Sequence, residues 1–300
     1  MVTRDALNIS AQLYPFASHH AQVGGHAMHY VDEGRGHPVV MVHGNPTWSF
    51  YWRNLIQALK DDCRTIAPDH IGMGLSDMPG RDAYPFTLER RCADFAAFMD
   101  GLKLTEPITL VVHDWGGMIG TTYAVDHPEK IKRMVVLNTA AFLLPEGRSL
   151  PAALAVARSK PMGEFAVRAL NAFAGLGTRV CVTRAPLPDD VRHAYVAPYD
   201  SWDHRLSVYE FVNDIPLSPG DRSYSAVTRV TSKLGALGKI PMLICWGGRD
   251  FVFNAPFLSE WKKHCPHAQV HEFPDAGHYV MEDARHDIIP LVRQFMGLSG

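Results

Sequence analysis

The sequence reads Leu110-Val111-Val112-His113-Asp114-Trp115-Gly116-Gly117-Met118-Ile119-Gly120 where an apolar run ends in a charged residue and a helix-like pattern begins at once. This order predicts a buried strand, a sharp turn and a helix. A strained turn of this kind lifts one side chain above the carboxyl edge of a parallel sheet. We therefore expect Asp114 to stand at that edge.

The pattern resembles the nucleophile elbow of the α/β-hydrolases, with Asp114 as the lifted residue. Val112 stands where the serine version has its first glycine, and a carboxylate replaces the hydroxyl. A serine that attacks an sp3 carbon leaves an inert ether, whereas a carboxylate leaves an ester that water can cleave. The elbow therefore predicts an alkylating substrate. The alternative is a structural aspartate that caps the helix starting near Trp115.

The composition predicts a large buried core. The chain has 300 residues, of which 47% are hydrophobic and 20% charged, with a formal net charge of −2. These values do not favour a polyanionic partner or intrinsic disorder, so nucleic-acid binding is not expected. Most of the 16 histidines lie outside any metal-ligand pattern. Neither a metal nor an organic cofactor is implied.

The cysteines and the N-terminus favour a cytoplasmic protein. Residues 1–16 lack a basic region followed by an apolar run, and no stretch reaches the length of a membrane span. Five scattered cysteines, an odd number without metal spacing, are typical of free thiols in a reducing compartment: Cys63, Cys92, Cys181, Cys245 and Cys265.

Strands and helices alternate along the first half of the chain. Residues 26–31 partly alternate between polar and apolar and predict an antiparallel hairpin arm, followed by a turn at 34–38. Continuous apolar runs then predict buried strands. The alternation of these strands with helices predicts a mostly parallel, doubly wound sheet, with strands at 39–42, 65–68, 110–114 and 133–138 and helices at 52–59, 87–102 and 115–127.

The alternation breaks for about a hundred residues between Asn138 and the next strand at 242–246. A connection of this length must form structure of its own. Residues 152–176 and 187–199 have helical patterns, which predicts a helical cap over the sheet edge. The chain is thus expected to divide into a core, an inserted cap and a second core part, at residues 1–141, 142–224 and 225–300.

Three titratable residues each end or follow a predicted strand: Asp114 at the end of 110–114, Asp250 after 242–246, and His278 after a strand near 269–273. Nucleophile, acid and base occur in this order in the α/β-hydrolase fold. In these roles His278 deprotonates water, and Asp250 orients its ring and stabilises the imidazolium.

Three other carboxylates compete for the acid role: Asp275, Glu282 and Asp283. They rank lower because none occupies a strand end, and they suit turn or helix N-terminal positions better.

Four motifs together resemble the haloalkane dehalogenases of the α/β-hydrolase superfamily: residues 43–47 (His-Gly-Asn-Pro-Thr), 69–76 (Asp-His-Ile-Gly-Met-Gly-Leu-Ser), 113–117 (His-Asp-Trp-Gly-Gly) and 277–278 (Gly-His). The resemblance implies that Asn45 and Trp115 donate side-chain hydrogen bonds to a departing halide. It also implies an oxyanion hole from their backbone N–H groups. Asn138 occupies a place where some members carry the acid, which favours Asp250 here. Asn45 has the alternative role of fixing the turn before Pro46.

A closer resemblance concerns the substrate. Three segments resemble the β-lactone decarboxylases of bacterial long-chain olefin biosynthesis: residues 138–142, 195–199 and 214–219. This implies that Asp114 opens a four-membered lactone bearing two alkyl chains, giving a cis-alkene and carbon dioxide. Attack on the ring's sp3 carbon and attack on its carbonyl both remain open. The resemblance also implies association with neighbouring pathway enzymes. A homo-oligomer is the alternative assembly.

Three other functions remain as alternatives. The first is a haloalkane dehalogenase that hydrolyses haloalkanes to alcohol and halide. The second is an epoxide hydrolase, which shares the His-Asp-Trp-Gly elbow and would recruit cap tyrosines from among Tyr195, Tyr199 and Tyr209. The third is a ligand-sensing protein without chemistry, against which the complete set of nucleophile, acid and base argues.

Overall fold

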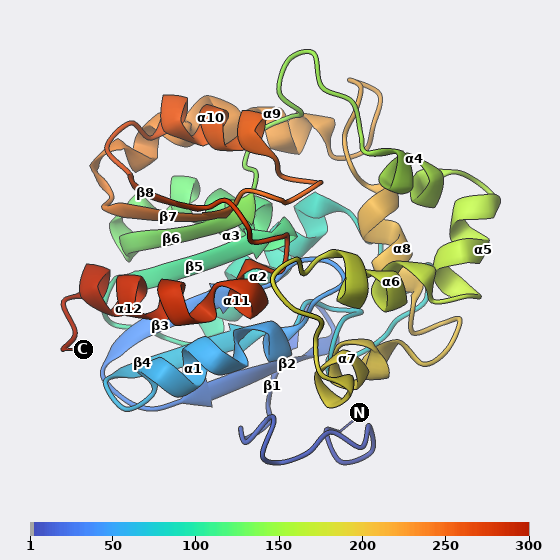
Figure 1. The fold of residues 1–300 in the computed structure, drawn as a ribbon, viewed down its shortest axis with the longest axis horizontal. Helices are drawn as coiled ribbons and strands as arrows, with labels where there is room; N and C mark the ends of the chain where they lie inside the picture. The colour runs from blue at the N-terminus through green and yellow to red at the C-terminus, as the bar shows by residue number, and fades with distance from the viewer. Residues whose placement is uncertain (1–2, 300) are drawn as a thin grey trace.

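A computed structural model describes residues 3–299, and its centre is a single twisted sheet (Figure 1). Within this range the strand order is β1-β2-β4-β3-β5-β6-β7-β8. The strands are β1 (His19–Val23), β2 (His26–Glu33), β3 (His37–Val42), β4 (Cys63–Pro68), β5 (Ile108–Asp114), β6 (Ile131–Thr139), β7 (Met242–Gly247) and β8 (Gln269–Phe273).

The pairing of the strands confirms the expected fold class. From β4 to β8 all neighbours are parallel, while β1 pairs antiparallel with β2 and β2 antiparallel with β4. The expected hairpin arm is β2, but its hairpin partner is β1. The turn near Gly34 leads into β3, which lies on the far side of β4 and does not pair with β2.

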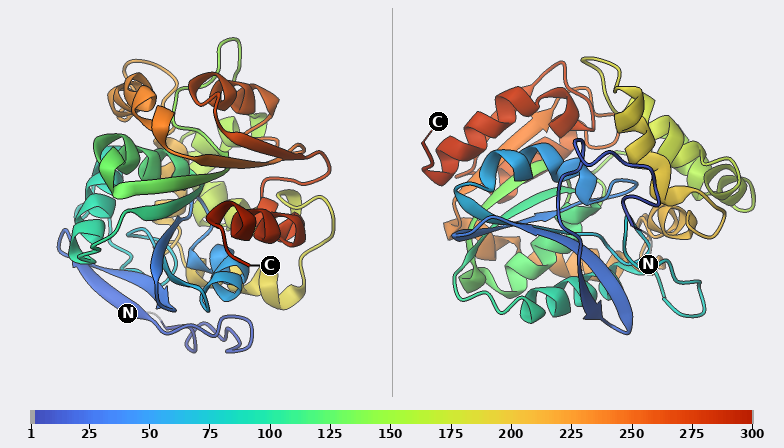
Figure 2. Two further views of the ribbon diagram at one scale, coloured as in Figure 1. Left: turned by 90° about the vertical axis from the view of Figure 1, so that its left-hand side faces the viewer. Right: turned by 90° about the horizontal axis from the view of Figure 1, so that it is seen from below.

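Helices cover both faces of the sheet (Figure 2). On β5, Leu110 and Val112 belong to one buried apolar cluster and Val111 to the other, so successive side chains face opposite helical layers. One layer contains α2 (Leu88–Gly101), α3 (Trp115–Asp126), α9 (Tyr224–Lys233) and α10 (Ala255–His264). The other contains α1 (Arg53–Leu59), α11 (Val280–Asp283) and α12 (Arg285–Met296). Burial on both faces explains the continuous apolar runs.

Five helices between β6 and α9 lie over the carboxyl edge of the sheet (Figure 1). They are α4 (Ala152–Arg158), α5 (Met162–Arg168), α6 (Ala172–Val180), α7 (Asp189–Val196) and α8 (Leu206–Asn213). A single helical pattern over 152–176 was therefore too long. The chain breaks at Ser159–Pro161, and Asn171 adopts a positive φ of 51° between α5 and α6.

Four short 3-10 helices complete the secondary structure of residues 3–299: η1 (Ser49–Trp52), η2 (Pro128–Lys130), η3 (Ala197–Tyr199) and η4 (Leu234–Lys239). No helix in this range is long and apolar enough to cross a membrane. Residues 1, 2 and 300, which the expected domain division includes, lie outside the described residues.

A buried ion pair joins the core to the helices above it. Arg53 of α1 donates to both carboxylate oxygens of Glu282 in α11, at 2.5 and 2.9 Å, and Tyr195 of α7 donates its hydroxyl to the same carboxylate. Removing one partner from such a cluster would leave a charge buried without compensation. This contact therefore fixes α7 over the carboxyl end of the sheet.

Candidate active site

The elbow after β5 is a tight turn that only small residues can follow. Asp114 has a φ of 52°. A Cβ at Gly116 would lie 2.0 Å from the carbonyl oxygen of Val42, and a Cβ at Gly117 would lie 1.7 Å from Oγ1 of Thr139. The hydroxyl of Thr139 donates to the carbonyl of Asp114. The two glycines therefore let α3 pack against β3 and β6 while Asp114 is lifted.

A backbone hydrogen bond holds Oδ1 of the Asp114 carboxylate, while Oδ2 faces His278. The backbone N–H of Asn45 donates to Oδ1 at 2.6 Å. A Cβ at Gly44 would lie 2.0 Å from that same oxygen, so this close approach requires glycine. Burial raises the pKa of Asp114, although His278 and the backbone N–H groups of Asn45 and Trp115 act to lower it. The Oδ2 atom is left to face the ring of His278.

His278 and Asp250 form a buried hydrogen-bonded pair. Nδ1 of His278 lies 2.8 Å from Oδ2 of Asp250. The other Asp250 oxygen accepts the backbone N–H groups of Val252 at 2.7 Å and Phe253 at 3.0 Å. Burial acts to lower the pKa of His278, but the negative charges of Asp250 and Asp114 outweigh it, so the pKa is raised above the ordinary 6.5.

The competing carboxylates are engaged elsewhere. Glu282 is paired with Arg53, and Asp275 is an exposed partner of Arg184. Asp283 accepts the backbone N–H of Gly277 at 2.7 Å. Of the carboxylates weighed for the acid role, Asp250 is thus the one that bonds the His278 ring.

Asn138 holds two strands together at the place where an acid was considered. Its amide donates to the carbonyl of Gly247 at 3.1 Å and accepts the N–H of the same residue at 2.7 Å. These two hydrogen bonds join the carboxyl ends of β6 and β7.

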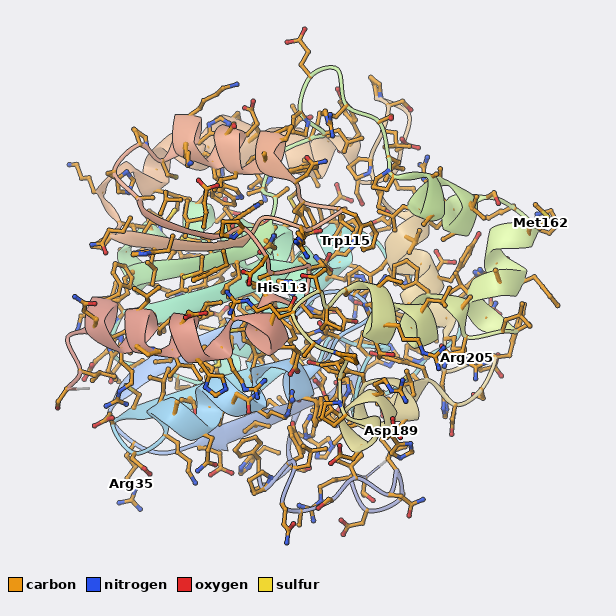
Figure 3. All side chains as sticks on the ribbon, in the orientation of Figure 1. Arg35, His113, Trp115, Met162, Asp189 and Arg205 are labelled. Atoms are coloured by element: carbon orange, nitrogen blue, oxygen red, sulfur yellow. The ribbon has the colours of Figure 1, made fainter. Side chains whose placement is uncertain are left out.

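The two expected anion donors, Asn45 and Trp115, both line the cavity that contains Asp114. Trp115 lies where the sheet meets the cap helices (Figure 3), and its ring packs against Phe211. The indole N–H of Trp115 donates to no acceptor within residues 3–299. The Asn45 amide donates to the carbonyl of Val208 at 3.1 Å, which leaves its second N–H for a ligand. Sequence patterns gave no sign of this contact.

The cavity above Asp114 is almost wholly apolar and has a volume of about 590 Å³. This size lies within the usual range for small-molecule sites. Its polar groups belong to Asn45, Asp114, Trp115 and His278, and its apolar walls come from α4, α6 and the segments after β6 and β7. Such a cavity favours an apolar substrate with one reactive polar centre.

The three cap tyrosines do not line this cavity. Tyr195 donates to Glu282, and the hydroxyl of Tyr199 lies 3.4 Å from the carbonyl oxygen of Thr47. Tyr209 is fully buried. The positions of these hydroxyls weigh against an epoxide hydrolase that activates its substrate with cap tyrosines.

Residues 37–284 match the family model described as α/β hydrolase fold. The chain belongs to the α/β-hydrolase family. This α/β-hydrolase is 52% identical to a cis-3-alkyl-4-alkyloxetan-2-one decarboxylase from Shewanella oneidensis, over 95% of this chain and 89% of the relative. A decarboxylase of the same name from Xanthomonas campestris is 44% identical, over 91% and 93%. A haloalkane dehalogenase from Mycolicibacterium paratuberculosis is 33% identical, over 90% and 89%.

Solved structures show the same fold for this α/β-hydrolase. The haloalkane dehalogenase DatA from Agrobacterium tumefaciens has a TM-score of 0.84 at 23% identity, covering 94% of this chain and 96% of its own. The haloalkane dehalogenase DbeA from Bradyrhizobium elkani has a TM-score of 0.84 at 25% identity, covering 94% and 98%. The resemblance to haloalkane dehalogenases and, more strongly, to the lactone decarboxylases is therefore confirmed.

Sequence reasoning missed two residues that shape the site of this α/β-hydrolase. The Phe253 ring stacks on His278 with centroids 5.8 Å apart. Nε2 of His113 lies 2.9 Å from the carbonyl oxygen of His278. His113 precedes the elbow residue, so its proximity to the site was foreseeable, whereas Phe253 lies in a loop whose path depends on the Asp250 turn.

Proposed function

We propose that this α/β-hydrolase is a β-lactone decarboxylase that converts cis-3,4-dialkyl β-lactones to cis-alkenes and carbon dioxide. The observation that carries the proposal is the identity of 52% and 44% to two enzymes named for that substrate class, against 33% to the haloalkane dehalogenase. The apolar cavity supports it, because a lactone with two alkyl chains presents mainly hydrocarbon around one polar ring.

The proposed roles follow the contacts. Oδ2 of Asp114 is the attacking atom, because Oδ1 is held by the N–H of Asn45. The side-chain donors of Asn45 and Trp115 stabilise the negative charge that develops on the leaving group. His278, oriented by Asp250, holds and deprotonates water wherever a covalent ester must be hydrolysed.

If Asp114 attacks the ring's sp3 carbon, the lactone is converted to alkene and carbon dioxide without consuming water. Asp114 displaces the ring oxygen, which leaves as a carboxylate and creates an alkyl ester on the enzyme. Loss of carbon dioxide then supplies the electron pair that forms the double bond and expels the Asp114 carboxylate. One inversion during attack, followed by an anti elimination, gives the cis-alkene from the cis-lactone. Attack on the carbonyl carbon gives instead a mixed anhydride and an alkoxide.

A paired assay tests the substrate. Alkene formed from a dialkyl β-lactone is followed by gas chromatography, and halide release from 1-bromobutane or 1,2-dibromoethane is followed in parallel. We expect a higher catalytic efficiency for the lactone, with modest halide release, because the donors of Asn45 and Trp115 also suit bromide. Efficient halide release with no detectable alkene would refute the proposal and leave the haloalkane dehalogenase alternative.

Three further expectations belong to this proposal. Residues 142–224 act as the cap that selects the substrate, between core parts 1–141 and 225–300. The protein works in the cytoplasm, in line with its five free cysteines. It acts beside other olefin-pathway enzymes, as its resemblance to proteins of that pathway implies, or as a homo-oligomer.

A further inference from the structure

Six large apolar side chains of the cap are exposed to an extent that core packing does not explain. Each is between 52% and 71% exposed. They lie within 25 consecutive residues of α4, α5, α6 and the α5–α6 turn, and we call them the cap rim: Val156, Met162, Phe165, Leu170, Leu176 and Val180. Met162 stands at the outer edge of the molecule (Figure 3). Gathered exposed apolar residues of this kind mark interaction surfaces.

The cap rim is continuous with the substrate cavity. Val156, Leu176 and Val180 are more than half exposed and also line the cavity that holds Asp114. Residues that belong to both the outer surface and the cavity wall mark its opening. An apolar molecule entering the cavity therefore crosses an apolar rim.

The segment that carries the cap rim has more basic than acidic residues, although the whole chain is slightly negative. Residues 148–184 contain six arginines and lysines and a single acidic residue, Glu164. Arg158 is paired with Asp221 and Arg168 with Glu164. Arg184 is paired with Asp275 and Asp287. Lys160 and Arg179 are exposed and make no ion pair within residues 3–299. An apolar surface flanked by cations matches a bilayer with anionic headgroups.

We infer that the cap rim docks on the surface of an anionic lipid bilayer and opens the cavity toward its hydrocarbon. The apolar side chains would enter the headgroup boundary while Lys160 and Arg179 meet lipid phosphates. A second copy of the chain fits this surface less well, because it would bring two positive rims together. The delivery of a lipid-dissolved lactone to Asp114 rests on the proposed function, whereas the docking itself does not.

Vesicle sedimentation without any substrate tests the docking. The wild type is expected to sediment with equimolar phosphatidylcholine and phosphatidylglycerol vesicles, less with phosphatidylcholine alone, and less at high salt. Lys160→Glu/Arg179→Glu and Met162→Ser/Phe165→Ser/Leu170→Ser should each lower the partition coefficient at least about tenfold. Lys103→Glu/Lys239→Glu is the charge-matched control, because both lysines are exposed and precede the amino ends of β5 and β7, away from the cap.

Two results would overturn the inference. The first is that the wild type does not bind vesicles, or that the control variant Lys103→Glu/Lys239→Glu loses vesicle binding as much as the rim variants do. The second is a concentration-dependent dimer in sedimentation velocity that the triple serine variant abolishes, together with no vesicle binding. A second copy of the chain would then cover the rim.

A kinetic experiment separates this inference from the proposed function. The rim variants should turn over a dispersed short-chain lactone normally and a vesicle-held long-chain lactone slowly, and vesicle binding stands even if neither lactone reacts.

Discussion

Nε2 of His278 lies 3.7 Å from Oδ2 of Asp114, close enough to act on the same reacting group but too far for a hydrogen bond between them. The attacking oxygen is thus not tied to the base, while Nδ1 of the same ring is tied to Asp250. This separation of a free nucleophile from an oriented base suits a reaction in two steps, in which a covalent adduct forms first and is resolved second.

Asp114→Ala should abolish turnover of both lactone and bromoalkane, with a loss of at least about 10⁴-fold, because it removes the nucleophile. The backbone strain at a φ of 52° is already present with aspartate, and the change leaves the packing of the core nearly untouched. Thermal melting should therefore still show a folded protein. Turnover above a trace in a folded variant would exclude covalent catalysis by Asp114.

His278→Ala should allow attack but block hydrolysis of an alkyl ester on Asp114. With a bromoalkane that the wild type hydrolyses, intact-protein mass spectrometry should show an alkyl adduct that accumulates, and peptide mapping should place it on Asp114. The double variant with Asp114→Ala is the control and should show none. If the single variant shows no adduct either, His278 is not the hydrolytic base.

Asp250→Asn and Asp275→Asn separate the acid from its competitor. Asp250→Asn should lower kcat by up to about 10⁴-fold, because the amide favours the wrong tautomer of His278. Asp275→Asn should change kcat little, since Asp275 is an exposed partner of Arg184 and does not touch the histidine. The opposite ranking in steady-state assays would transfer the acid role to Asp275.

The main features of this fold could be predicted because its signals are local. The sequence shows the apolar runs of β3, β5, β6 and β7 directly, and it also shows the glycines after Asp114. β1 was missed because His19–Val23 is short and polar, with its pairing set by β2. The break at Asn171 and the contact of the Asn45 amide with Val208 depend on tertiary packing, which spacing does not encode.

The titration of His278 should report on Asp250. Because Asp250 and Asp114 favour the imidazolium, the pKa of His278 lies above 6.5, so the ring keeps its proton to a higher pH than an ordinary histidine. Its neutral, basic form, and with it ester hydrolysis, is therefore lost as the pH falls through this raised value. Histidine NMR, with the signal assigned by its absence in His278→Ala, should give a lower midpoint in Asp250→Asn. An unchanged or higher midpoint would contradict the pairing.

The source of oxygen distinguishes the two chemistries within one protein. Hydrolysis of an alkyl ester on Asp114 adds water oxygen to the Asp114 carboxylate, because water attacks the ester carbonyl. Decarboxylation after attack on the lactone's sp3 carbon consumes no water. In oxygen-18 water, turnover of a bromoalkane should therefore label the peptide that contains Asp114, whereas turnover of a dialkyl β-lactone to alkene should leave it unlabelled. The same enzyme preparation serves as its own control. Label that enters Asp114 in proportion to the alkene formed would rule out the water-free route.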